Sequence, residues 1–179
     1  MQNHQCSCGH SHQGDHDHDH HQPTHAESCG CGCGHTHEEI APVGDLSILQ
    51  QNILFGLYER SCLPVARFTM TSTKDEALYA VALAPVYLGS AEDTMEQVKL
   101  LGAELLQLAQ GGLITLDYDI SLKGYAYLEY DNAALFHYFI ETVQEGSTKS
   151  NALFDVANIE KGSMALTDIG TQRVTAMLG

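Results

Sequence analysis

The chain has 179 residues, a formal net charge of −15 at pH 7, 11 His and 6 Cys. No apolar run approaches the ~18 residues that span a membrane, and the first residues lack the basic and apolar regions of a secretory signal. We therefore expect a cytoplasmic protein without membrane contact, and the acidic balance disfavours general affinity for nucleic acid.

The composition is divided unevenly along the chain. Ten of the 11 His and five of the six Cys fall within the first 37 residues, and residues 1–44 hold six acids and no Lys or Arg. Residues 45–179 hold 17 acids against eight basic residues, a net charge of −9. This split predicts a tail, residues 1–44, followed by one domain, residues 45–179.

The tail contains an internal repeat of the form C-x-C-G-H-x-H. Residues 6–12 read CSCGHSH, and residues 31–37 read CGCGHTH. Each copy supplies two thiolates and two imidazoles, which is the ligand number and type of a tetrahedral Zn²⁺ site, and imidazole also suits Ni²⁺. In a reducing cytoplasm, clustered Cys favour metal binding over disulfides.

A second cluster of His lies between the two copies, interleaved with Asp. Low hydrophobicity and high charge predict that the tail is disordered without metal, so we expect flexible, exchangeable sites and not a folded zinc module. Zn²⁺ or Ni²⁺ is the expected cofactor, with its identity left open. The predicted metal ligands are Cys6, Cys8, His10, His12, His16, His18, His20, His21, His25, Cys29, Cys31, Cys33, His35 and His37.

In composition, the tail resembles the His/Cys-rich extensions of bacterial nickel- and zinc-handling proteins, such as certain prolyl isomerases and the nickel-insertion GTPases of hydrogenases. The resemblance implies a role in metal handling. The rest of the chain carries no G-x-x-x-x-G-K-[ST] motif, which excludes the GTPase.

Three helices are predicted at the start of the domain. Helical spacing of Leu46, Leu49, Ile53 and Leu57 predicts the first, over about 46–59. The second begins at a capping box, residues 73–76, and stops before Pro85. The third begins at residues 90–93 by similar capping chemistry and ends at residues 111–112, both Gly.

The second half of the domain mixes strands and helices. Alternation predicts a half-buried strand over 113–120, residues 125–130 read as extended or loop, and a helix follows from Asn132 to Gly146. Residues 154–159 and 163–166 are typical of a hairpin across residues 160–162. A short closing helix follows Thr167 as its N-cap.

This order resembles a winged-helix domain. The third helix running into Leu113 and Ile114 is similar to the step from a recognition helix to a wing strand. The segment Gly162–Gly170, with Leu166 and Thr167, is similar to the G-x-x-x-L-T-x-x-G that closes wings in MarR-, PadR- and ArsR-like regulators. The resemblance implies an α+β fold: a winged-helix-like helical domain with a small β-sheet or wing, preceded by the disordered tail.

The third helix of that family enters a DNA groove. Here it carries Glu92, Asp93, Glu96 and Glu104 against one base, Lys99. A surface of this charge repels phosphate. DNA is therefore disfavoured as a partner, and we expect a protein partner or a homodimer.

Other side chains in the domain allow more than one interpretation. Asp117 and Asp119, near Glu129 and Asp131, suit a cation or acid–base site, or else a solvated strand face. His137 fits a surface pair with Glu141, and Cys62 fits a small buried residue. An aromatic run suits a ligand pocket, or else core and dimer surface. Its members are Tyr118, Tyr125, Tyr127, Tyr130, Phe136, Tyr138 and Phe139.

The sequence carries no H-E-x-x-H, G-x-S-x-G or G-x-G-x-x-G motif, and we expect no enzyme. The leading hypothesis is a protein for metal handling or sensing whose tail binds zinc or nickel and whose domain docks on a partner. The alternative is a metal-responsive winged-helix transcriptional regulator, and a small-molecule-binding domain is a third possibility.

Overall fold

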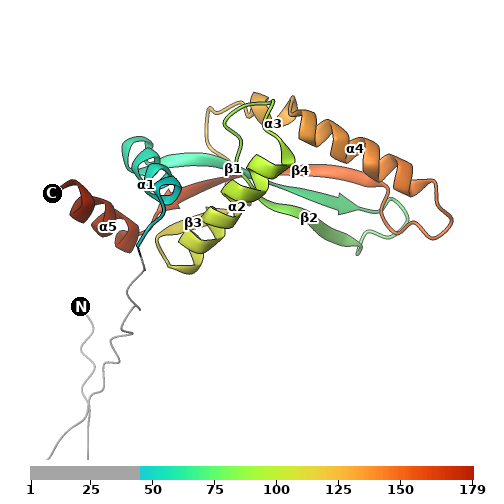
Figure 1. Cartoon of the computed structure of the whole chain (residues 1–179). Helices are drawn as coiled ribbons and strands as arrows, with labels where there is room; N and C mark the ends of the chain where they lie inside the picture. The colour runs from blue at the N-terminus through green and yellow to red at the C-terminus, as the bar shows by residue number, and fades with distance from the viewer. Residues whose placement is uncertain (1–44) are drawn as a thin grey trace, which may run out of the picture. The chain divides into compact units, whose positions relative to one another are not determined.

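A computed structural model of the protein describes residues 45–179 (Figure 1). The predicted α+β fold class is confirmed for this part of the chain. The elements are α1 (Ile48–Arg60), β1 (Cys62–Thr71), β2 (Tyr79–Val86), α2 (Met95–Gln110), β3 (Ile114–Asp117), α3 (Leu128–Asp131), α4 (Ala134–Ser147), β4 (Val156–Leu166) and α5 (Asp168–Leu178).

The four strands form one antiparallel sheet in the order β2-β1-β4-β3. Its centre is the long pair β1–β4, which stays in register from Cys62 opposite Ala165 to Thr71 opposite Val156. β2 and β3 are therefore the two edge strands. A short β3 and a longer β2 flank opposite sides of this central ribbon (Figure 1).

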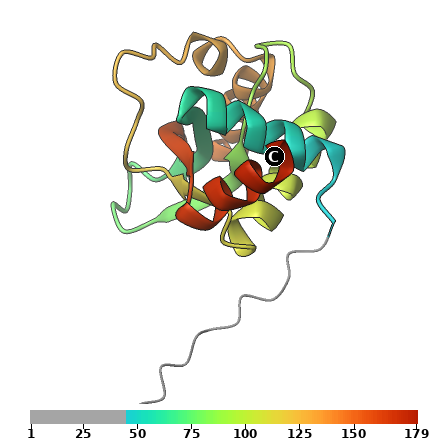
Figure 2. The same cartoon turned by 90° about the vertical axis from the view of Figure 1, so that its left-hand side faces the viewer.

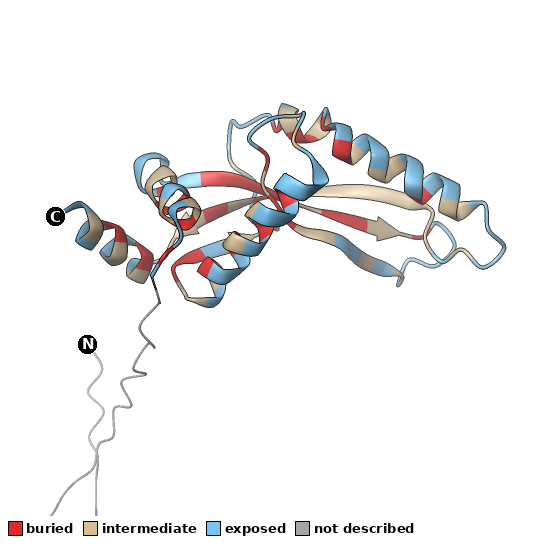
Figure 3. Ribbon diagram, in the orientation of Figure 1, coloured by how far each residue is buried: buried red, intermediate tan, exposed pale blue. Residues whose placement is uncertain are grey.

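Helices cover the two faces of the sheet at opposite ends of β1. Leu63 and Val65 point toward α1 and α5, which lie side by side at one end of the domain (Figure 2). Ala66 and Phe68 have the opposite parity and pack with the α3–α4 segment. α2 contributes to both clusters, with Leu105 in the first and Val98 in the second. Buried residues accordingly follow the inner sides of the helices and the middle of the sheet (Figure 3).

Side-chain caps determine where the main helices begin. The hydroxyl of Ser47 accepts a hydrogen bond from the backbone of Gln50, whose side chain accepts one in return from the backbone of Ser47. Thr94 and Gln97 form the same capping box at the start of α2. The helix predicted over 46–59 is confirmed. The third helix begins at Met95, later than the predicted start in residues 90–93.

The helix predicted to start at residues 73–76 is wrong, because that part of the chain leads into β2. Thr73 does not cap a helix: its backbone N–H donates to the Asp155 carboxylate (2.7 Å), and its hydroxyl donates to the same group. From Tyr79 onward the chain pairs with β1, Tyr79 lying opposite Thr71. Pairing with a neighbouring strand here outweighs local helix propensity.

The hairpin predicted across residues 160–162 is also wrong. β4 runs without a break from Val156 to Leu166, and Gly162 lies opposite Val65 in the middle of the central pair. β1 itself has no counterpart among the predicted elements. The observed order α-β-β-α-β-α-α-β-α replaces the order on which the winged-helix resemblance depended.

The remaining elements match the sequence more closely. Of the strand predicted over 113–120, residues 114–117 form β3, and the helix predicted over 132–146 forms as α4. Residues 125–130, expected to be extended or loop, include the start of the short helix α3. The closing helix α5 has Thr167 as its N-cap, as predicted. No helix in residues 45–179 is both long and apolar enough to cross a membrane.

Candidate functional site

The predicted metal ligands lie outside the described residues. All fourteen fall between Cys6 and His37, before the first described residue, Asp45. Within residues 45–179, His, Cys, Asp and Glu do not gather in any group of three or more that would hold a metal ion.

The acids that suggested a cation site have separate partners, and that of Asp119 is Arg67, at 3.9 Å. The carboxylate of Asp117 accepts hydrogen bonds from the backbone N–H groups of Asp119 and Ile120 (2.9 and 3.1 Å), so it closes the turn after β3. Asp131 forms an ion pair with Lys161 at 2.7 Å. Glu129 accepts a hydrogen bond from Tyr125. The structure therefore does not bring these carboxylates into one acid–base pair.

Cys62 and His137 are both exposed and belong to different parts of the domain. Cys62 begins β1 directly after α1. His137 lies on α4, which packs against β4. The expectation that Cys62 is a small buried residue is wrong, because β1 begins at the surface there.

Most of the aromatic run forms core. Tyr127 and Tyr130 are 3% and 0% exposed, and Phe68 contacts the rings of Phe136 and Phe139 at centroid distances of 5.2 and 5.4 Å. Tyr130 links α3 to β1 and to the segment after β2: its hydroxyl donates to the Pro64 carbonyl (3.1 Å) and accepts from the Leu88 N–H (3.4 Å).

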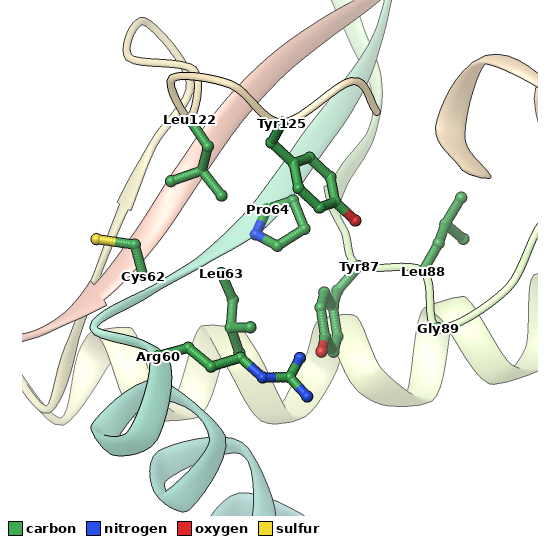
Figure 4. Close-up of a pocket in the computed structure, with 9 residues that line it drawn as sticks. All are labelled: Arg60, Cys62, Leu63, Pro64, Tyr87, Leu88, Gly89, Leu122 and Tyr125. Atoms are coloured by element: carbon green, nitrogen blue, oxygen red, sulfur yellow. The ribbon is translucent and has the colours of Figure 1, made fainter. Parts of the chain in front are cut away.

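A pocket of about 300 Å³ lies where the chain enters β1 (Figure 4). Two tyrosine rings, Tyr87 and Tyr125, face the space beside Pro64, and the guanidinium of Arg60 extends toward Tyr87. The thiol of Cys62 lies at the opposite end and points away from the rings. The lining residues are Arg60, Cys62, Leu63, Pro64, Tyr87, Leu88, Gly89, Leu122 and Tyr125.

The phenols of this pocket are held in their neutral form. Burial raises the pKa of Tyr87, and the positive charge of Arg60 only partly opposes this shift. Burial and the hydrogen bond to Glu129 raise the pKa of Tyr125 to about 12. The pocket thus combines one cation and two neutral hydroxyls with apolar walls, and the Tyr125 hydroxyl is already bonded to the Glu129 carboxylate.

A second polar group of residues lies on the same face of the sheet as α1 and α5, farther along β1, where these helices do not cover it. We call it the Arg67 cluster, and its members are Arg67, Thr69, Tyr79, Tyr118 and Glu160. The carboxylate of Glu160 accepts hydrogen bonds from all three residues that reach it: Arg67 (2.5 Å), Thr69 (3.2 Å) and Tyr79 (3.3 Å). The Arg67 guanidinium lies 4.8 Å from the centre of the Tyr118 ring. These internal contacts give the Arg67 cluster a structural role.

Sequence reasoning did not find the pocket or the Arg67 cluster. Arg60 and Tyr87 are 27 positions apart, and they meet only because β2 returns beside the start of β1. Arg67 and Glu160 are opposite each other in the β1–β4 register. Their opposite charges on paired strands were the available signal, but it requires both strands to be recognised.

Comparison with known proteins gives little further information. No protein-family model matches the chain, and no curated protein matches it. A solved structure from the hydrocarbon-degrading marine bacterium Alcanivorax borkumensis SK2, described as an uncharacterized protein, is similar at 15% identity and a TM-score of 0.45. The match covers 75% of this chain and 88% of that one.

Proposed function

We propose that this protein binds Zn²⁺ or Ni²⁺ through its tail and serves in metal handling or sensing, while its domain docks on a protein partner. The observation that carries the proposal is the repeat C-x-C-G-H-x-H at residues 6–12 and 31–37. Each copy provides four nitrogen and sulfur ligands, the number that a tetrahedral site requires.

The charge of the chain supports this proposal. The tail adds six acids without any base, and the domain adds a net charge of −9. A field of this sign attracts divalent cations and repels nucleic-acid phosphates. Residues 92–104 hold Glu92, Asp93, Glu96 and Glu104 with Lys99 as their one base. Docking on a protein fits this surface better than contact with DNA.

Within the tail, the proposal assigns two classes of ligand. Cys6, Cys8, His10 and His12 form one mixed site, and residues 31–37 form the other. The His between the two copies act as a weaker reservoir, because imidazoles interleaved with Asp lack thiolates. Metal affinity is pH-dependent, since thiols and imidazoles must lose their protons to bind.

Measurement of bound metal in the full chain tests the proposal. The variant Cys6→Ser/Cys8→Ser/Cys31→Ser/Cys33→Ser removes the thiolates of both copies. We expect at least a ~10-fold loss of Zn²⁺ affinity in competition titrations with a chromophoric chelator. The matched control, Cys62→Ser, removes a thiol outside the tail and retains tight binding. Equal affinities for the two variants would contradict the assignment.

A further inference from the structure

β2 is an unprotected sheet edge. In the order β2-β1-β4-β3, one side of β2 pairs with β1, and no strand of residues 45–179 lies on its other side. Alternate residues of such a strand direct their N–H and C=O groups outward, where another strand can pair with them. Tyr79, Val81 and Ala82 are exposed, and only the end near Pro85 is buried (Figure 3).

The opposite edge shows how this domain protects a strand. β3 has only four residues, and it ends at Asp117, whose carboxylate closes the following turn. Short length and a terminal charge are devices that prevent edge-to-edge pairing. β2 has eight residues and no charge, and the surrounding residues 77–91 also carry none. Residues 77–91 are the longest stretch without a charged residue in a domain that has 17 acids.

Apolar surface accompanies the β2 edge on both faces of the sheet. On the face of the Arg67 cluster, Tyr79 and Val81 are 47% and 46% exposed. On the other face, an open groove of about 260 Å³ runs between β2, α2 and α4. Ala82, Leu83 and the exposed side chains of Met95 and Tyr138 are among the mostly apolar residues that line it, and Lys99 on α2 is the one charged residue of the lining. Contiguous apolar surface of this kind marks an interaction site.

We propose that the β2 edge pairs antiparallel with the β2 edge of a second copy of this chain, which joins the two four-stranded sheets across a two-fold axis. A two-fold contact brings the same patch of both copies together, so a charged residue near the axis would meet a like charge. The β2 edge is uncharged over its whole length, whereas the net charge of −9 makes two copies repel over most of their remaining surface.

One contact of this kind covers both exposed edges and brings together the apolar shoulders of both copies. The pairing is centred on residues 79–83, because Pro85 has no N–H to donate and the Pro85 end lies under α2. There a side chain at Gly102 would come within 2.9 Å of the Pro85 carbonyl oxygen. The two Val81 side chains then lie close to the axis.

The test is the molar mass of the full chain, measured by sedimentation and light scattering in buffer with EDTA and a thiol reductant. EDTA removes metal and the reductant prevents disulfides between copies, so the result does not depend on the function proposed for the tail. We expect a mass of twice 19.5 kDa for the wild-type chain. The variant Val81→Lys places like charges near the axis and is expected to raise the dimer dissociation constant at least ~10-fold.

The matched control is Leu128→Lys, which replaces an apolar side chain that is 62% exposed on α3. It is expected to leave the dimer intact. Hydrogen exchange supplies a second measurement: amides of residues 79–83 that face outward exchange more slowly in the wild-type dimer than in Val81→Lys. A monomeric wild-type chain, a dimer insensitive to Val81→Lys, or unprotected β2 amides would each overturn the proposal.

Discussion

Gly162 is needed where two segments of backbone approach closely. A Cβ at this position would lie 2.1 Å from the Asp117 carbonyl oxygen and 2.6 Å from the Tyr118 Cα, both of them backbone atoms that cannot move aside without shifting the chain after β3. The Gly162 carbonyl also accepts a hydrogen bond from the buried Tyr127 hydroxyl (2.6 Å). Glycine inside a strand here marks close approach.

We therefore expect Gly162→Ala to lower the free energy of unfolding by about 3 kcal/mol, the upper part of the range for overpacking a core. Urea denaturation followed by circular dichroism measures it. Gly146→Ala is the control, because a Cβ at Gly146 in α4 meets nothing within 4 Å. Alanine there is neutral or stabilising by up to about 1 kcal/mol. Similar losses in both variants would refute the role given to Gly162.

Tyr130 is a second residue on which the stability of the core depends, because its buried hydroxyl makes two hydrogen bonds to the backbone. Removal of its hydroxyl in Tyr130→Phe leaves the Pro64 carbonyl and the Leu88 N–H without this partner inside the core. We expect a loss of about 1–3 kcal/mol in the free energy of unfolding. Tyr138→Phe, at a position 63% exposed, serves as the control and is expected to change it little.

The same residue affects stability at high pH. Burial raises the pKa of Tyr130 above its ordinary value of 10.0, so the folded chain keeps this proton while the unfolded chain releases it. The stabilisation is fully present below pH 10, and it is lost as the pH rises from 10 toward the raised value. The slope of unfolding free energy against pH should be shallower in Tyr130→Phe. Equal slopes would contradict this assignment.

At the scale of elements, the sequence predicted helices better than strands. α1, α4 and α5 follow from their apolar periodicity or their caps, which are local features of the chain. β2 and β4 depend on β1, a strand that contains Pro64 and is buried on both faces, so it shows no simple alternation. Because β1 was not predicted, its two neighbours β2 and β4 had no partner strand that would have indicated an extended conformation.

The residues of the G-x-x-x-L-T-x-x-G segment are explained by tertiary contacts. Gly162 leaves room for the backbone of Asp117 and Tyr118 at the end of β3. Thr167 caps α5, and its hydroxyl donates to the Gly112 carbonyl (2.6 Å). Gly170 passes close to the Leu113 carbonyl, which a Cβ there would meet at 2.0 Å. The residues that suggested a wing therefore fasten β4 and α5 to β3.

The candidate functional residues also differ in whether local sequence could predict them. The fourteen tail ligands could be proposed from the sequence because a repeated spacing of Cys and His is a local signal. The pocket at Arg60 and the Arg67 cluster could not, because each joins residues from strands whose pairing was unknown. Asp117 and Asp119 are close in sequence, but the carboxylate of Asp117 accepts a hydrogen bond from the Asp119 N–H in the turn after β3 and does not form a cation site with it.

At the scale of the whole molecule, charge opposes association and apolar edge surface favours it. Each copy carries −15, of which −9 belongs to the domain, whereas the proposed contact has no charged residue along β2. Salt screens the repulsion between the copies without weakening the strand pairing. The dimer should therefore become tighter as ionic strength rises.

We expect the dissociation constant of the wild-type dimer to fall several-fold between about 20 mM and about 500 mM NaCl in the presence of EDTA, because the Debye length shortens from about 20 Å to about 4 Å over this range. Sedimentation equilibrium at each salt concentration measures it. An interface built on ion pairs, such as a swapped Arg67–Glu160 contact, would show the opposite trend, since salt weakens attraction between charges. A dimer that dissociates with added salt would thus place the contact on a charged surface, away from β2.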